Sequence, residues 1–302
     1  MTFTTQIKEE ITKEENNNIE DLTSLCTYLK FNATLEEDKM TVMVVNASVA
    51  RWIFKLLKTN YNVLIKLTTR TMKRFKARNL YILEVKEKLD LIYKDIDNIF
   101  KEINTSSDEE KKAFLKGMFL ACGSINDPKK NQYHLEFLVK EEEDAKLIDD
   151  LLNSLKIKSK VLKRDREYMV YVKSSENISD FIKYLGAFNA LFYFEDIRIY
   201  KDHKNMVNRL NNCEQANVER TLKSSKTVLD NIKYLEDNDL LMLLDDRSKE
   251  IIEYKKKYPD TSLGELADII TMETNKSITK SGINHHFRKI NALVKKAKEN
   301  HE

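Results

Sequence analysis

Apolar and polar residues alternate along the first hundred positions in two distinct periods. Alternate apolar positions, such as Val42 and Val44 or Tyr81, Leu83 and Val85, indicate half-buried strands. Apolar residues three or four positions apart indicate amphipathic helices. The pattern predicts helices over about 20–31, 47–60 and 90–102, and strands over 33–37, 40–46, 62–68 and 79–85.

The same order of elements returns at an offset of roughly 90 residues. The second stretch predicts helices over 108–122, 141–155 and 175–185, and strands around 124–127, 132–139, 157–163 and 167–173. Agreement of so many elements in the same order indicates an internal duplication. We therefore expect a doubled α+β domain with pseudo-two-fold symmetry.

The helix that opens the second copy carries small residues on one face. Gly117 and Ala121 are four positions apart, and Thr27 takes the place of Gly117 in the first copy. Small side chains allow two helices to approach closely. We expect these two helices to pack against each other at the seam between the copies, with Gly123 permitting a sharp exit into the next strand.

Basic residues bracket the second hairpin of each copy. Matching basic hairpins would line one side of a continuous sheet surface, which suits a phosphate backbone. The alternative is that lysine-rich hairpins are solvated edges that prevent aggregation. The candidate phosphate contacts are Arg70, Lys73, Arg74, Lys76 and Arg78 in the first copy and Lys158, Lys160, Lys163 and Arg164 in the second.

The chain beyond Asp245 predicts only helices. The capping sequence Ser262–Glu265 opens the second of them, and Thr279 is the expected N-cap of the third. The predicted segments are helices over Asp246–Tyr258 and Leu263–Ile270, a loop over Thr271–Ile278, and a helix from Lys280 to about Lys298. This order is typical of a helix-turn-helix.

The third of these helices separates apolar from polar positions. Ile283, Phe287, Ile290 and Val294 form one stripe, and the interval 275–298 holds seven Lys or Arg and no Asp or Glu. A helix of this kind fits the major groove of DNA. The alternative is a solvated basic helix in a small helical domain. The candidate DNA-binding residues are Lys280, Ser281, Asn284, His285, Arg288 and Lys289.

Composition narrows the class of protein. The chain has 302 residues, 41% of them hydrophobic and 33% charged, and a formal net charge of +3, so a case for DNA must rest on where the charges lie. Cys26, Cys122 and Cys213 are too far apart for a disulfide framework, and the histidines have no metal-ligand spacing. With no stretch of 18 apolar residues, we expect a cytoplasmic protein without a membrane segment, metal or cofactor.

The doubled pattern resembles the LAGLIDADG homing endonuclease fold, in which two αββαββα halves are joined by a pair of packed helices. In that family an acidic residue before the last glycine of each motif binds the catalytic divalent metal. The corresponding residues here are Asn32 and Cys122, which are poor ligands for Mg²⁺. Asp127, next to Pro128, has the features of a turn residue. The resemblance therefore implies a retained scaffold without nuclease activity.

The whole chain resembles the WhiA family of bacterial proteins, which joins a degenerate LAGLIDADG-like domain to a helix-turn-helix. The resemblance is most specific in Phe114–Ser124, Asn212–Thr221 and Lys280–Ile290. Two departures are the longer loop Thr271–Ser277, and His286 and Phe287 in place of Arg and Leu. The implied domains are a LAGLIDADG-like domain over 1–202 (repeats about 1–102 and 108–202), a helical linker over 203–240, and a helix-turn-helix domain over 241–302 with its motif at about 262–294.

The family is linked to transcription regulation, sporulation in some lineages, and cell division and chromosome segregation in others. A non-enzymatic, nucleoid-associated regulator that binds double-stranded DNA is the favoured function. A division or nucleoid scaffold that acts through transcription or division proteins remains open, because a fold does not determine a biological role. An active endonuclease is disfavoured by Asn32 and Cys122. The oligomeric state is left open.

Overall fold

The computed structural model describes residues 2–14, 17–72 and 78–299. The chain divides into two compact units, residues 1–202 and 203–302, and each is described by itself. The first unit contains the duplication, and its two copies have the same element order.

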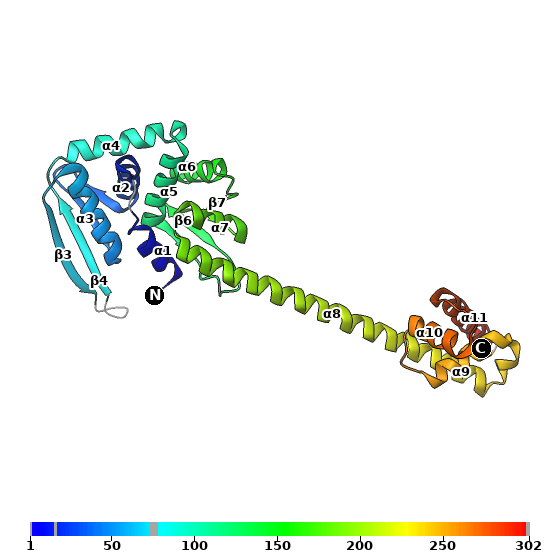
Figure 1. Cartoon of the computed structure of the whole chain (residues 1–302). Coiled ribbons are helices and arrows are strands. Elements are labelled where there is room, and N and C mark those ends of the chain that lie inside the picture. The colour runs from blue at the N-terminus through cyan, green and yellow to red at the C-terminus, as the bar shows by residue number, and fades with distance from the viewer. Residues whose placement is uncertain (1, 15–16, 73–77, 300–302) are drawn as a thin grey trace. The chain divides into compact units, whose positions relative to one another are not determined.

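The first copy consists of α2 (Asn18–Asn32), β1 (Ala33–Leu35), β2 (Met40–Val44), α3 (Ala47–Tyr61), β3 (Ile65–Met72), β4 (Arg78–Val85) and α4 (Leu89–Glu102). The second consists of α5 (Asp108–Cys122), β5 (Gly123–Ile125), β6 (Leu135–Val139), α6 (Glu142–Ser154), β7 (Lys160–Lys163), β8 (Tyr168–Val172) and α7 (Ser175–Tyr184). The predicted doubled α+β fold is therefore confirmed (Figure 1). The strand predicted at 132–139 begins only at Leu135. Asp127 lies in a turn before it, where its carboxylate accepts from the Lys129 amide at 2.9 Å.

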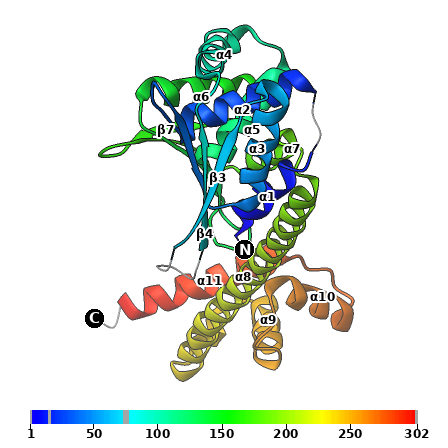
Figure 2. The ribbon, with the colours of Figure 1, turned by 90° about the vertical axis from the view of Figure 1, so that its left-hand side faces the viewer.

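Each copy closes its own four-stranded antiparallel sheet. The strand orders are β1-β2-β4-β3 and β5-β6-β8-β7, which are equivalent under the duplication. The two basic hairpins therefore belong to two separate hydrogen-bonded sheets, one in each copy. Figure 2 shows β3 and β4 as long neighbouring strands, with β3 at the edge of the first sheet.

One face of each sheet packs on helices. Val42 and Leu83 in the first sheet, and Phe137 and Val170 in the second, are fully buried in the core. The opposite face, called the open face below, follows from the strand register and side-chain alternation. Its members are Thr34, Thr41, Met43, Lys66, Thr68, Arg70, Leu80, Ile82 and Glu84 in the first sheet and Ser124, Glu136, Leu138, Lys160, Leu162, Met169 and Tyr171 in the second.

The seam between the copies is the predicted pair of helices. In Figure 1, α2 and α5 lie side by side at the centre of the first unit. A Cβ added at Gly117 would lie 2.2 Å from the Ser24 carbonyl oxygen and 2.9 Å from Thr27 Cβ. Gly123 has an ordinary extended backbone, with φ −84°, so conformational freedom is not its role. Its Cβ would lie 2.3 Å from Phe119 Cδ2, so the glycine provides space.

A helix that the sequence pattern did not predict precedes the first copy. In α1 (Phe3–Ile11), Phe3, Ile7 and Ile11 are buried at a spacing of four, and the Thr2 side chain caps the first turn. Glu10 accepts hydrogen bonds from the backbone amides of Asn189 at 2.7 Å and Ala190 at 3.1 Å. Both residues lie in the first turn of α8 (Phe188–Asp237). These contacts join α1 to the core of the first unit.

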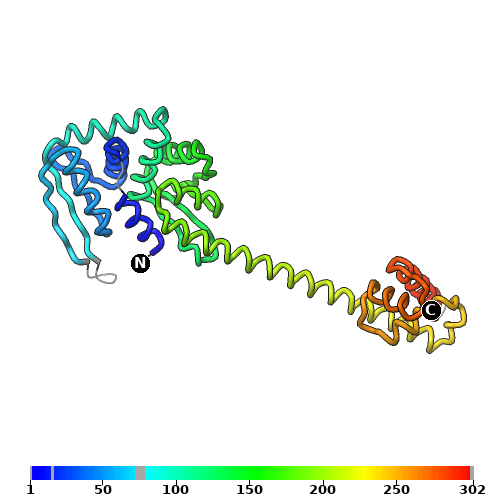
Figure 3. Tube along the Cα trace, viewed as in Figure 1, coloured from blue at the N-terminus to red at the C-terminus, as the bar shows by residue number. Residues whose placement is uncertain are grey.

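The region expected to be a linker over 203–240 belongs largely to one long helix, α8 (Phe188–Asp237), which is continuous in Figure 3. Its last turns are part of a second core, because Val228, Ile232 and Leu235 are buried with residues of the C-terminal helices. Those elements are η2 (Leu240–Leu243), α9 (Asp246–Lys257), α10 (Leu263–Thr274) and α11 (Lys280–Glu299).

The turn between α10 and α11 is shorter than predicted. The loop expected over Thr271–Ile278 is wrong in its first half, because α10 continues to Thr274. Asn275 ends the helix in the left-handed conformation, with φ 53°. The Thr271 hydroxyl accepts from the Ile278 amide at 3.2 Å and so ties the helix to the far side of the turn.

Candidate nucleic-acid interface

Helix α11 presents one buried and one exposed side. Ile283, Phe287, Ile290 and Val294 are at most 3% exposed and hold the helix on the second core. Five of the six candidate DNA-binding residues are exposed and Asn284 is half-buried. The exposed members are Lys280, Ser281, His285, Arg288 and Lys289.

The candidates differ in their contacts within the protein. Across residues 2–14, 17–72 and 78–299, no hydrogen bond or ion pair holds the side chains of Lys280, Asn284 or Arg288. Lys289 pairs with Asp245, its Nζ lying 3.4 Å from Oδ2. The donors of Lys280, Asn284 and Arg288 are therefore available to an external acceptor without breaking an internal contact.

His286 faces the protein. Its Nδ1 lies 2.8 Å from the Ser248 hydroxyl and 3.9 Å from Asp245 Oδ1, both in the first turn of α9 or its cap. Burial lowers the pKa of the His286 imidazole, which favours the neutral form at this helix contact. This residue anchors α11 on α9 and is not positioned as a substitute for a DNA-contacting arginine.

Capping positions the two helices of the motif. Ser262 and Glu265 form the predicted capping box at the start of α10. The Thr279 hydroxyl accepts from the Gly282 amide at 3.2 Å, which confirms its predicted position as a cap of α11. With both first turns satisfied, α10 and α11 keep their ends at defined places on the core.

The structure separates the basic residues of the hairpins. Arg70 and Lys160 lie on the open faces, and Arg164 continues the open-face side of β7 with its guanidinium 3.0 Å from Met169 Sδ. Lys163 lies on the other side of β7, with its ammonium over the Tyr168 ring at 5.6 Å. Lys158 precedes β7 because that strand begins at Lys160, later than predicted. Lys73, Arg74 and Lys76 lie outside the described residues, as does the side chain of Arg78.

The open faces also carry residues that the sequence pattern did not single out. Glu84 pairs with Lys66 at 3.2 Å, and Glu136 lies 3.2 Å from the His134 ring nitrogen. Tyr171 stacks on His134, and the Lys173 ammonium lies 5.2 Å from its ring centroid. Period-two alternation along 167–173, combined with the pairing partner of each strand, would have placed Tyr171 there. Each open face is thus a mixture of cations, aromatic or apolar groups and one carboxylate.

The two positions that would carry metal-binding acids do not fit a divalent cation. Asn32 uses its amide to donate to the Tyr28 hydroxyl. Burial raises the pKa of the Cys122 thiol to about 12, so it stays protonated at neutral pH, and it donates to the Met118 carbonyl at 3.4 Å. The Lys8 ammonium, whose charge acts on Cys122, donates to the Leu120 carbonyl at 3.0 Å. An ammonium repels a hard cation such as Mg²⁺, and an amide and a neutral thiol bind it only weakly.

Two further properties concern the described part of the chain. It contains no group of three or more His, Cys, Asp or Glu arranged to hold a metal ion. None of its helices combines the length and apolar composition that crossing a membrane requires.

Comparison with known proteins gives matches to both parts of the chain. Residues 19–99 match the family described as the WhiA N-terminal LAGLIDADG-like domain, 111–204 the WhiA LAGLIDADG-like domain, and 207–294 the WhiA C-terminal HTH domain. A probable cell division protein WhiA from Oceanobacillus iheyensis is 36% identical over 99% of this chain and 98% of its own length. Another from Bacillus cytotoxicus is 38% identical over 98% and 97%.

Solved structures agree on the fold. Full-length DUF199/WhiA from Thermatoga maritima superposes with a TM-score of 0.59 at 22% identity and covers 98% of this chain and 99% of its own. The N-terminal LAGLIDADG domain of DUF199/WhiA gives a TM-score of 0.52 at 20% identity, over 61% of this chain and 90% of its own. At these identities the likeness concerns architecture.

Proposed function

The chain belongs to the WhiA family, and from this premise we propose that it is a non-enzymatic, nucleoid-associated DNA-binding protein that regulates transcription in connection with cell division and chromosome segregation. The related proteins are named as probable cell division proteins. The match over 207–294 to a helix-turn-helix domain supports a direct role on DNA.

The observation that carries the proposal is the exposed side of α11. Lys280, Asn284 and Arg288 recur at a spacing of four along one side of this helix, which is the spacing that brings side chains to one face. Arginine and asparagine donate to base edges in the major groove, and lysine contacts phosphate. In this proposal α11 is the recognition helix, the motif spans about 262–294, and Ser281, His285 and Lys289 flank the three central contacts.

The first unit acts as a DNA-contacting scaffold in the same proposal. Arg70, Lys160 and Arg164 supply phosphate contacts from the open faces, and the duplication gives each sheet an equivalent strand order. Phosphate contacts position a protein without reading sequence, so base preference is assigned to α11 alone.

Absence of nuclease activity rests on the two seam helices. The purified chain is expected to leave plasmid DNA intact with Mg²⁺ or Mn²⁺, because Asn32 and Cys122 do not supply carboxylates and Lys8 adds a cation nearby. Asn32→Asp together with Cys122→Asp should not restore cutting, since catalysis also needs a precisely held substrate. Metal-dependent cleavage by the purified parent chain, absent from a mock preparation, would contradict this part of the proposal.

Genome-wide mapping of bound DNA tests the regulatory role. The parent chain should occupy a limited set of sites that share a sequence, and Arg288→Ala should lose those sites while cell levels of the protein stay equal. The alternative is a scaffold that acts through division proteins. If Arg288→Ala abolishes site occupancy but leaves transcription of the neighbouring genes and cell division unchanged, regulation through α11 is contradicted and a scaffold that acts without DNA is favoured.

A further inference from the structure

Lys116 is a buried lysine without a hydrogen bond. It lies in α5 next to Gly117, and only 5% of it is exposed. Within the described part of the chain its Nζ has no hydrogen-bond acceptor, and the carboxylate oxygen of Glu14 lies 4.0 Å away. Burial lowers the pKa of the Lys116 ammonium, because a low-dielectric surrounding disfavours charge. A buried ammonium that has an ion pair at 4.0 Å but no hydrogen-bond acceptor destabilises a fold relative to one whose hydrogen bonds are satisfied.

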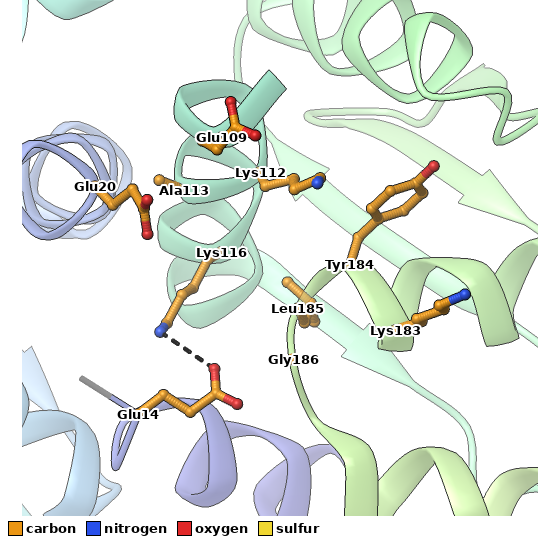
Figure 4. Close-up of a pocket in the computed structure, with 10 residues that line it drawn as sticks. All are labelled: Glu14, Glu20, Glu109, Lys112, Ala113, Lys116, Lys183, Tyr184, Leu185 and Gly186. Carbon is orange, nitrogen blue, oxygen red and sulfur yellow. Dashed lines mark ion pairs between the residues drawn. The ribbon is translucent and has the colours of Figure 1, made fainter. Parts of the chain in front are cut away.

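The side chain of Lys116 is part of the lining of a pocket of the first unit of about 150 Å³, and its amine points to Glu14 (Figure 4). Its walls come from Glu14 in the segment that follows α1, the start of α2, the first turns of α5, and the end of α7 with the two residues after it. The charged lining residues are Glu14, Glu20, Glu109, Lys112, Lys116 and Lys183.

The lining charges balance and are partly segregated. Three carboxylates face three ammonium groups, so the pocket as a whole is neutral. In Figure 4, Glu20 lies on the α2 side of α5, whereas Lys183 and the Tyr184 hydroxyl lie on the α7 side. A simple anion on Lys116 would also meet the carboxylate of Glu14. A ligand that carries both charges would meet a partner of opposite sign at each end.

Gly186 lies against the carboxylate of Glu14. This glycine has φ +77°, in the left-handed region that side chains rarely adopt, and a Cβ there would lie 2.4 Å from Glu14 Oε2. The glycine therefore leaves room for the carboxylate at the pocket wall. Burial raises the pKa of the Glu14 carboxyl, so this group gains from a cationic partner.

We propose that this pocket binds a small zwitterion with the chemistry of a free α-amino acid, whose carboxylate accepts from Lys116 Nζ and whose ammonium pairs with Glu14. The ligand supplies the acceptor that the Lys116 amine lacks and a cation for the carboxylate beside it. This site is separate from α11 and requires no DNA, so it stands or falls independently of the proposed function.

Thermal unfolding and calorimetric titration of the full chain test the proposal, with each of the twenty standard amino acids as the probe and KCl at equal concentration as the reference. At least one amino acid should raise the Tm saturably, by about 5 °C at a concentration near 100 times its Kd. The corresponding hydroxy acid lacks the ammonium and the corresponding amino amide lacks the carboxylate, and both should bind at least tenfold more weakly. No shift with any amino acid would overturn the proposal. Saturable stabilisation by inorganic phosphate or acetate alone would overturn it too, since the site would then take a simple anion.

Matched variants locate the site. Lys116→Met keeps the aliphatic stem and should reduce the affinity for the amino acid at least tenfold. Lys111 lies on the same helix but does not line the pocket, so Lys111→Met should bind the amino acid like the parent. Glu14→Gln removes the second charge and is the independent variant if Lys116→Met does not fold. Unchanged affinity in Glu14→Gln, or in a folded Lys116→Met, contradicts the assignment.

Discussion

Arg288 and Asn284 lie one helical turn apart on α11, and neither side chain is used inside the described protein. Replacing either with Ala removes donors that we propose contact DNA and leaves the buried stripe of the helix intact. We expect each substitution to weaken binding to the preferred sequence by about 1–3 kcal/mol and to change the Tm very little. Fluorescence anisotropy at fixed salt, with specific and scrambled duplexes, measures this difference.

Arg288→Lys provides the control for charge. Lysine keeps the positive charge but not the planar pair of donors that recognises guanine. It should therefore retain affinity for the scrambled duplex and lose discrimination. Equal discrimination by Arg288→Ala and the parent would mean that α11 does not read bases.

Lys8 shows how a single buried group affects stability. Burial lowers the pKa of its ammonium to about 8, whereas in an unfolded chain it lies near 10.4. Between about pH 8 and 10.4 the unfolded chain binds a proton that the folded chain does not, so the contribution of Lys8 to the free energy of unfolding rises with pH in this window. Below pH 8 both states are protonated and the contribution is constant.

Lys8→Met should remove that dependence. The free energy of unfolding of the variant minus that of the parent should be largest below pH 8 and should decrease as the pH rises to about 10. Urea unfolding at several pH values measures the difference, and the exposed Lys13→Met should follow the parent curve. A constant difference between Lys8→Met and the parent from pH 7 to 10 would show that Lys8 is not desolvated in solution.

At the scale of elements, the seam of α2 and α5 and the start of α10 offer two glycines in opposite surroundings. Gly117→Ala places a Cβ 2.2 Å from the Ser24 carbonyl oxygen, a backbone atom that cannot move without separating the helices. We expect a loss of about 1–3 kcal/mol in the free energy of unfolding, or more. Gly264→Ala meets nothing closer than Ser262 Oγ at 3.9 Å and should be neutral or stabilise by up to about 1 kcal/mol.

Chemical unfolding, followed by circular dichroism for both variants, tests this contrast. The helices belong to different units, so the transition of each unit is compared with the same transition in the parent. Similar small effects of both substitutions would mean that the two seam helices are not in close contact.

The seam was predictable because Gly117, Ala121 and Thr27 report a close approach through residue size alone. The equivalence of the two sheets followed from the duplication, whereas the order of the strands within each sheet was not predicted. Helix α1 was missed because only Phe3, Ile7 and Ile11 are buried, and they occur within a mostly polar stretch. The end of α10 was missed because Thr271 and Thr274 are poor helix formers. The Thr271 hydroxyl accepts from the Ile278 amide across the folded turn, and the Thr274 hydroxyl donates to the Ile270 carbonyl one helical turn back.

The candidate site residues also differ in whether local periodicity or only the tertiary structure reveals their role. The exposed side of α11 followed from helical periodicity, since the buried stripe identifies the opposite face. The role of His286 did not, because its partner Ser248 lies 38 positions earlier and only the tertiary structure brings them together. Lys163 was grouped with Lys160 by sequence proximity, whereas an odd number of positions along a strand places them on opposite faces. Lys116 stands out in the sequence as the one charge within Ala113–Cys122, but its pocket depends on residues from three other segments.

At the scale of the whole molecule, the formal net charge of +3 is too small to attract DNA by itself, so the salt dependence of binding reports local contacts. The logarithm of affinity falls with the logarithm of salt concentration by about 0.9 per phosphate neutralised. If Arg70, Lys160 and Arg164 contact phosphate, replacing all three with Gln in the full chain should reduce the slope by up to about 2.7. Base preference should stay unchanged, because phosphate contacts do not read sequence.

A second triple variant removes the same charge elsewhere in the first unit. Lys94 and Lys101 are exposed on α4, and Lys163 lies on the side of β7 away from the open face, so Lys94→Gln, Lys101→Gln and Lys163→Gln together should leave the slope near that of the parent. Equal loss of slope in both triple variants would indicate a general effect of net charge. If neither triple variant changes the slope, the first unit does not contact the phosphate backbone. The hairpin cations are then solvated edges that prevent aggregation.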